Sequence, residues 1–205
     1  MKGVRTGLSV GLFILLSVLA RALDKSRVAD TLHPSAQHLA TINVLIRDYA
    51  NVLARDLATA ADEISRIFAA DGINVTWASD NHPAPRRGQM QLVINVETRS
   101  MASRIKMDDG VVGFTLPCRV KQRTCYAYIF YYKLANAGPE IPQPRLLAYV
   151  AAHEIGHSVL DRADHSKSGI MLAQWRHEQL LDARRKRLQF TEAEVQAMHS
   201  RLRSP

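Results

Sequence analysis

Hydrophobic and polar residues follow two different periods in the first patterned stretch of the chain. Ile42, Val44 and Ile46 occupy every second position, which is typical of a strand with one buried face. From Leu53 to Ala70 the apolar residues recur every three or four positions, which predicts an amphipathic helix that ends at Gly72. We expect the apolar stripe of this helix to pack on a sheet, and a partner-binding face is the alternative.

The same two periods predict the remaining elements. Strands are expected at residues 41–49, 73–78, 91–96, 113–116 and 126–132. Helices are expected at residues 145–160, at about 175–187, and from Thr191 onward. Thr191 and Glu194 have the spacing of a capping box, in which each side chain caps the backbone of the other residue. This order of elements predicts a single α+β domain, with a mixed β-sheet packed on a long N-terminal helix and on a second, apolar helix.

Four tyrosines fall in the last expected strand: Tyr126, Tyr128, Tyr131 and Tyr132. If that strand lies at the edge of the sheet beside the apolar helix, an extended peptide could pair with its backbone. We expect the tyrosines to pack within the sheet, and pairing with a peptide is the alternative.

The first 22 residues have the three parts of a secretory signal peptide. Lys2 and Arg5 precede an apolar run from Leu8 to Leu19, and Ala20-Arg21-Ala22 is a small-x-small site. We expect cleavage after Ala22, which leaves residues 23–205 as the mature domain in a secreted or periplasmic location. An uncleaved membrane anchor is the alternative, but the apolar run is shorter than the roughly twenty residues that a span needs. No stable membrane association is expected after cleavage.

Composition narrows the class of protein. The chain has 205 residues, of which 47% are hydrophobic and 22% charged, which excludes a disordered chain, a fibre and a polytopic membrane protein. Export predicts that Cys118 and Cys125 form a disulfide across a short loop, the alternative being a pair of metal-binding thiolates. The net charge is +8, but the basic run 184–187 contains no aromatic residue, so we expect a solvated helix face and no nucleic-acid partner.

The sequence His153-Glu154-Ile155-Gly156-His157 carries the chemistry. Residues four apart on a helix differ by about 40° in direction and about 6 Å along the axis, so the two imidazoles point the same way and can bind one Zn²⁺. Glu154 is displaced around the helix, where it can reach a water beside the metal rather than the metal itself. Two surface histidines are the alternative. The apolar neighbours of the motif argue against it, because buried imidazoles need partners.

A catalytic zinc has three protein ligands and an open position, so a third ligand is needed. His165 is the nearest candidate, eight residues after His157. A continuous helix would carry it about 12 Å along the axis, so the helix must end near Leu160 and the chain must fold back. Glu178, on the following helix, is the competing third ligand.

The segment from His153 to Trp175 resembles the metzincin clan of zinc endopeptidases, and more closely a group of secreted, zincin-like bacterial proteins. The features they share are the two-histidine motif, a nearby third histidine, and a tight turn of sequence Ser-Gly-Ile-Met that ends at Met171. Two features depart from the clan's pattern: Leu160 stands where the clan has glycine, and His165 comes two residues late.

This resemblance implies a zincin-like fold and a zinc metalloendopeptidase that cleaves a peptide or protein substrate. His153, His157 and His165 match the zinc ligands, Glu154 the general base, and Met171 the turn beneath the metal. Two other classes remain open. One is a non-catalytic zinc-binding protein, against which Glu154 argues because a structural zinc has no need of it. The other is a zinc hydrolase that acts on non-peptide amides.

Overall fold

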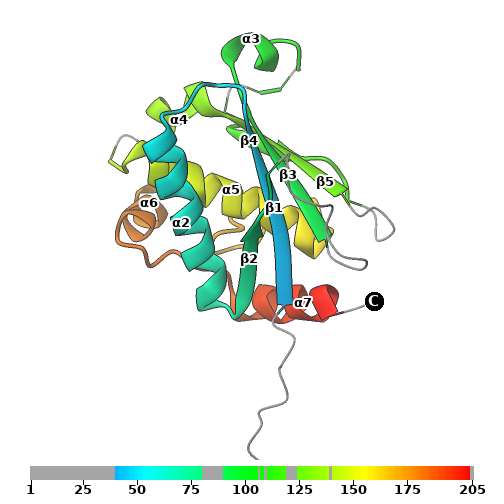
Figure 1. Ribbon diagram of the computed structural model, residues 1–205. Helices are drawn as coiled ribbons and strands as arrows, with labels where there is room; N and C mark the ends of the chain where they lie inside the picture. The colour runs from blue at the N-terminus through cyan, green and yellow to red at the C-terminus, as the bar shows by residue number, and fades with distance from the viewer. Residues whose placement is uncertain are drawn as a thin grey trace, which may run out of the picture. The chain divides into compact units, whose positions relative to one another are not determined.

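A five-stranded mixed sheet forms the centre of the structure, a computed structural model (Figure 1). The strands are β1 (Ala40–Asp48), β2 (Ile73–Trp77), β3 (Met90–Glu97), β4 (Gly113–Thr115) and β5 (Thr124–Phe130). They lie in the order β2-β1-β3-β5-β4. Strands β2, β1, β3 and β5 are parallel to one another. Strand β4 pairs antiparallel with β5 and forms one edge of the sheet.

The structure describes residues 40–79, 90–105, 107–108, 110–118, 124–138 and 140–203. The expected signal peptide at residues 1–22 and its cleavage site lie outside these residues. The described part belongs to one unit that begins at Leu39. Within it, no helix is both long and apolar enough to cross a membrane.

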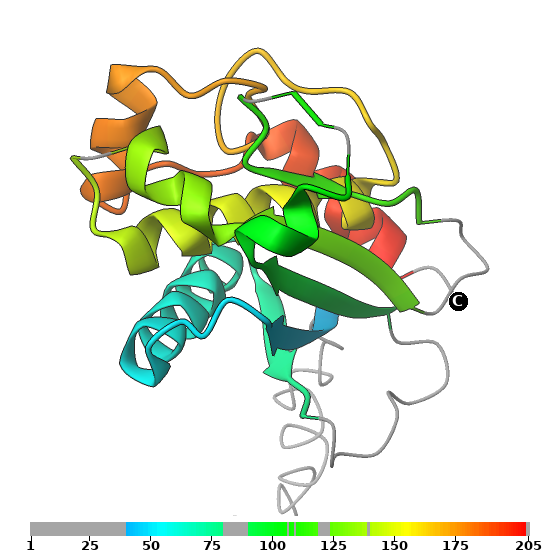
Figure 2. The ribbon, with the colours of Figure 1, turned by 90° about the horizontal axis from the view of Figure 1, so that it is seen from above.

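Helices α2 (Ala54–Ala70) and α5 (Gln143–Leu160) lie side by side against one face of the sheet (Figure 2). The other helices are α3 (Arg99–Ala102), α4 (Tyr131–Ala137), α6 (His177–Arg184) and α7 (Glu192–Arg203). Helix α7, coloured red, packs against α5 and against β1 (Figure 1). The α+β class expected from the sequence, with a sheet on one long N-terminal helix and one apolar helix, is confirmed.

The core lies between the sheet and these two helices. Alternate residues of the strands are fully buried on the helix side, among them Ile42, Leu92 and Ile129. Ile64 and Phe68 of α2 are buried against them at the helical spacing that the sequence predicted. Helix α5 is buried on almost every side, because it lies between α2, the sheet and the segment that follows it. This accounts for its nearly continuous apolar sequence.

The expected strand at residues 126–132 is wrong at its end. Tyr131 and Tyr132 belong to α4, and Phe130 is the last residue of β5, paired with Glu97 at the end of β3. Strand β3 ends at Glu97, so β5 has no strand partner there beyond Phe130. The chain continues instead as a helix, in which Leu134, about one turn after Tyr131, is buried. The edge strand is also not this one, because β4 lies outside β5.

Candidate metal centre

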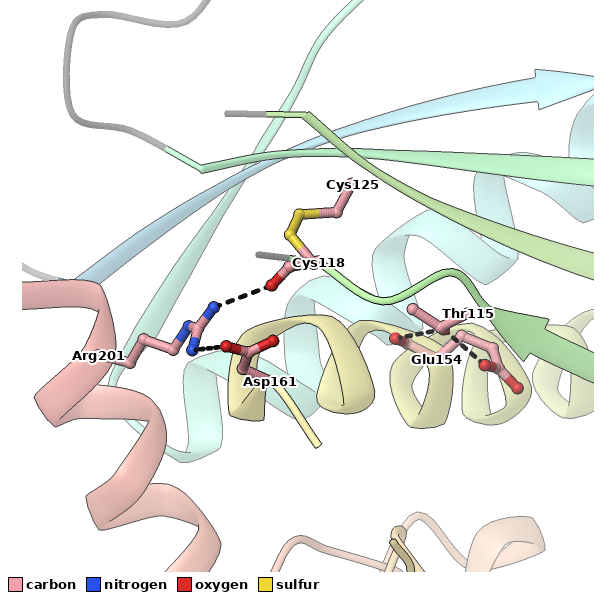
Figure 3. The surroundings of a disulfide bond; sticks show 6 residues. All are labelled: Thr115, Cys118, Cys125, Glu154, Asp161 and Arg201. Carbon is pink, nitrogen blue, oxygen red and sulfur yellow. Dashed lines mark hydrogen bonds and ion pairs between the residues drawn. A yellow bond between two sulfur atoms is a disulfide. The ribbon is translucent and has the colours of Figure 1, made fainter. Parts of the chain in front are cut away.

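Helix α5 carries the two-histidine motif and ends where the sequence required. Pro144 lies in its first turn, where a missing N–H costs nothing. Its last residue is Leu160, and Asp161 takes a left-handed conformation with φ of 53°. The Asp161 carboxylate pairs with Arg201 of α7, with Oδ2 at 2.8 Å from the guanidinium (Figure 3). The chain therefore reverses directly after the helix and returns His165 toward it.

The three histidines converge. The Nε2 atoms of His153 and His157 are 3.0 Å apart, and that of His165 is 3.3 Å from the Nε2 of His157. In the described part of the chain, these residues form a group whose possible ligand atoms all lie within 4.8 Å of one another. Glu178 is not part of this group: it is exposed, in the first turn of α6.

The hydrogen bonds on the far side of two rings decide which nitrogens are free. His153 Nδ1 lies 2.8 Å from the carbonyl oxygen of Ile170, and His157 Nδ1 lies 2.9 Å from that of Arg162. A carbonyl only accepts, so each Nδ1 carries the hydrogen and each neutral ring has a bare lone pair at Nε2. Two lone pairs facing each other at 3.0 Å repel unless a cation lies between them. The donor set therefore fits a metal ion that favours imidazole, as Zn²⁺ does.

Burial keeps these imidazoles neutral. It lowers the pKa of His153 to about 4, an effect that the hydrogen bond to the Ile170 carbonyl opposes and that the neighbouring His157 and His165 reinforce. Burial also lowers the pKa of His157. Both rings therefore offer lone pairs rather than N–H groups at neutral pH, which is the form that ligates metal.

Glu154 is enclosed beside the histidines, with 4% of its surface exposed. The hydroxyl of Thr115, on the edge strand β4, donates to its Oε2 at 2.7 Å and lies 3.0 Å from its carbonyl oxygen (Figure 3). Burial raises the pKa of the carboxyl to about 7, and the Thr115 hydrogen bond opposes that rise. A Cβ on Gly113 would lie 2.9 Å from the other carboxyl oxygen, so this side chain is closely held. No pattern in the sequence pointed to Thr115.

Met171 lies beneath the motif. It is fully buried, and it packs so closely on Gly156 of α5 that a Cβ there would come within 3.0 Å of the Met171 sulfur. The turn before it places the Ile170 carbonyl where it accepts from His153 and, at 3.1 Å, from the indole N–H of Trp175. The sequence placed Met171 near the centre, but it did not assign a role to the Ile170 carbonyl.

A cavity of about 600 Å³ opens onto these groups. Its wall includes the three histidines, Glu154, the whole of β4, and apolar side chains of α5 and α6 such as Leu146, Val150 and Leu180. The carboxyl of Glu154 and the free nitrogens thus face a space large enough for several residues of a substrate.

The disulfide between Cys118 and Cys125 is present, with the two Cα atoms 5.3 Å apart. It joins Cys118, three residues after the end of β4, to Cys125 in β5, and Cys118 also lines the cavity (Figure 3). The metal-binding alternative for these cysteines is excluded, because both sulfurs are used in the bond.

No family model and no curated protein sequence matches the chain. Among solved structures, the chain is similar to the crystal structure of archaemetzincin from Methanopyrus kandleri. The two share 14% sequence identity, and the match covers 82% of this chain and 99% of that chain with a TM-score of 0.47.

Proposed function

We propose that the protein is a zinc-dependent peptidase in which His153, His157 and His165 hold the metal and Glu154 is the general base. The observation that carries this proposal is the convergence of three imidazole nitrogens beside a buried carboxyl group in one cavity. A site that only fixed the fold would have no use for that carboxyl group, whose burial opposes its ionisation.

Each group at the site has a separate role in the proposed hydrolysis. When bound, zinc would lower the pKa of a water molecule and polarise the carbonyl of the substrate. Glu154 accepts the proton of the attacking water at a carboxylate oxygen and returns it to the leaving amine. Thr115 fixes the Glu154 carboxylate through the 2.7 Å hydrogen bond to Oε2. The carbonyls of Ile170 and Arg162 hold the two imidazole rings in orientation.

A peptide substrate is favoured over other amides by the position of β4. This strand lines the cavity and forms the edge of the sheet beside α5. An extended peptide could add to such an edge by backbone hydrogen bonds, with its side chains directed alternately into and away from the cavity. The tyrosine strand that the sequence suggested for this role is one position further inside the sheet.

The test combines metal analysis of the purified protein with cleavage of a peptide library. We expect one zinc ion per chain and hydrolysis that a chelator abolishes. Glu154→Gln should keep the zinc and lose hydrolysis by several powers of ten, because the amide cannot accept the water proton. Glu178→Gln, at an exposed glutamate of α6, is the matched control. Zinc binding without hydrolysis of any peptide, or an active Glu154→Gln variant, would refute the proposed function.

The third ligand has its own test, since two candidates were open at the level of sequence. We expect His165→Ala to weaken zinc binding by at least 10–100-fold, the loss typical of even indirect partners of a metal. Glu178→Ala should leave zinc affinity nearly unchanged. The opposite order would assign the third position to α6 and leave the roles of His153, Glu154 and His157 as proposed.

We also propose that the protein is exported to a secreted or periplasmic location and processed after Ala22. The Cys118–Cys125 disulfide supports this, because such bonds persist mainly in oxidising compartments. Mass spectrometry of the exported protein should find Leu23 as the first residue. An intact Met1 in the membrane fraction would refute it.

A further inference from the structure

The loop from Asp161 to Ser166 contains the backbone groups that orient two of the three histidines, His157 and His165. Its Arg162 carbonyl accepts the Nδ1 hydrogen of His157. His165 lies within it, and its ring contacts the rings of the other two histidines. Among the described residues, His165 has no carbonyl partner of the kind that holds the other two rings. The position of the third ring therefore depends on the backbone of this loop.

Glu194 of α7 binds this loop from beneath. Its side chain is 2% exposed, and its Oε1 accepts hydrogen bonds from the Arg162 guanidinium, at 2.9 Å, and from the hydroxyl of Ser166. Arg162 and Ser166 are also joined to each other at 2.9 Å. The second oxygen, Oε2, accepts the backbone N–H of Thr191 at 2.7 Å, as the capping box predicted. One buried carboxylate thus anchors both sides of His165 to the start of α7.

Arg201 repeats this arrangement two turns later on the same face of α7. It lies 2.8 Å from Oδ2 of Asp161, the residue at which the chain reverses. It also donates to the carbonyl oxygen of Cys118, at 3.3 Å, so the same side chain reaches the disulfide next to β4 (Figure 3). Helix α7 therefore holds the loop at its first residue and again at Arg162 and Ser166, although α7 contributes nothing to the cavity wall.

We propose that α7 positions the metal ligands: Glu194, with Arg201 as a second anchor, holds the loop 161–166 in the conformation that directs His157 and His165 to one zinc ion. The inference rests on the proposed function, because it concerns ligands of that zinc. The loop departs from the clan pattern that the sequence resembles, with Leu160 in place of a glycine and a third histidine two residues late. In this chain, ion pairs from Glu194 and Arg201 hold the loop at Arg162 and Asp161.

A role in stability alone makes a different prediction. A buried ion pair that only stabilised the fold would change the fraction of folded protein and leave the metal site of each folded molecule unaltered. A positioning role changes the site itself. The coordination of Co²⁺ in place of zinc distinguishes the two, because its visible absorption is strong in a four-coordinate site and weak when ligands are replaced by additional water.

The experiment compares the wild-type chain with Glu194→Gln, which keeps the size of the side chain and removes its charge. Glu192→Gln is the matched control, an exposed glutamate in the same first turn of α7. For Glu194→Gln we expect zinc affinity to fall 10–100-fold and the Co²⁺ absorption to weaken. In the metal-free protein, residues 161–166 should exchange amide hydrogens faster, including the Ser166 N–H that donates to the Met171 carbonyl at 2.8 Å. The control should match the wild type in all three.

Should Glu194→Gln fail to fold, Arg162→Gln tests the same contact from its more exposed side and leaves the capping of Thr191 in place. If the folded variant has the same zinc affinity and the same Co²⁺ spectrum as the wild type, the positioning role is overturned. The proposed zinc site is unaffected by that result. Unchanged exchange in residues 161–166 would overturn it as well. A wild-type chain that binds no zinc would instead overturn the proposed function, and this role of α7 with it.

Discussion

Gly156→Ala should destabilise the protein, although alanine is the better helix former. Gly156 lies inside α5, between the two histidines of the motif, and a Cβ added there meets Met171 and Phe190. The Cβ would lie within 3.0 Å of the Met171 sulfur and 3.0 Å from Cε1 of Phe190. Non-bonded heavy atoms are comfortable at about 3.5–4.0 Å, so one neighbour must move by on the order of 1 Å.

The magnitude follows from two opposing effects. Replacing glycine by alanine in a helix interior gains about 1 kcal/mol. Overpacking a close-packed core costs about 1–3 kcal/mol, and Met171 has little room to yield because it is fully buried and its carbonyl accepts the Ser166 N–H. With a cost in the upper part of that range, about 2–3 kcal/mol, we expect a net loss of about 1–2 kcal/mol in the free energy of unfolding. Zinc affinity should fall too, since the Met171 shift moves the neighbouring Ile170 carbonyl that orients His153.

Urea unfolding of metal-free Gly156→Ala, measured beside the wild type, is the assay. Gly110→Ala is the control, because nothing lies within 4 Å of a Cβ at that position. Adding Met171→Ala should remove the clash, so Gly156→Ala should cost less in that background than in the wild type. If Gly156→Ala proves as stable as the wild type, close contact with Met171 is not the reason for glycine here.

Three further predictions concern single groups. Thr115→Val should keep zinc stoichiometry but lower the hydrolysis rate by at least tenfold, since the Glu154 carboxyl loses its 2.7 Å donor, and Thr115→Ser should restore it. Burial raises the pKa of Asp71 from 3.8 to about 6, so the native state holds a proton that the unfolded state releases, and stability falls as pH rises through that window. Asp71→Asn should therefore be more stable than the wild type at pH 8, by about 1 kcal/mol after allowing for solvent screening, with the gain disappearing at pH 4 in urea titrations. Replacing Cys118 and Cys125 by serine should cost about 2.5 kcal/mol of chain entropy for a sequence separation of 7, and alkylation without reductant should find no free thiol in the wild type.

The sequence predicted those parts of the site that depend only on residues close together in the chain. The spacing of His153 and His157 fixes their direction on any α-helix. The need to bring His165 back required the helix to end near Leu160, and it ends there with Asp161 in the left-handed region. Asparagine and aspartate tolerate that region better than most residues, so the local sequence is enough to predict the reversal.

The parts that the sequence missed depend on where a distant segment ends. Phe130 is the last strand residue because β3 ends at Glu97, and nothing near Tyr131 in sequence carries that information. Thr115 donates to Glu154 across 39 residues, and either residue alone shows no sign of the other. Glu194 shows both cases at once: its bond to the Thr191 N–H follows from capping-box spacing, while its bond to Arg162 follows only from the packing of α7 on α5.

The orientation of the histidine rings depends on irregular backbone that is itself anchored from the C-terminal part of the chain. The carbonyl that holds His153 belongs to Ile170, whose N–H donates to the Gln189 carbonyl at 2.9 Å. Gly169 permits this approach, since its φ is 74° and a Cβ there would lie 2.6 Å from the same oxygen. Of the described residues after Leu180, 181–203, none lines the cavity. The segment around Gln189 must nevertheless be in place before the imidazole of His153 is fixed. We therefore expect zinc binding to be coupled to the packing of residues 189–203. The affinity of the three histidines for zinc should therefore depend on the docking of α7 as well as on the ligands themselves.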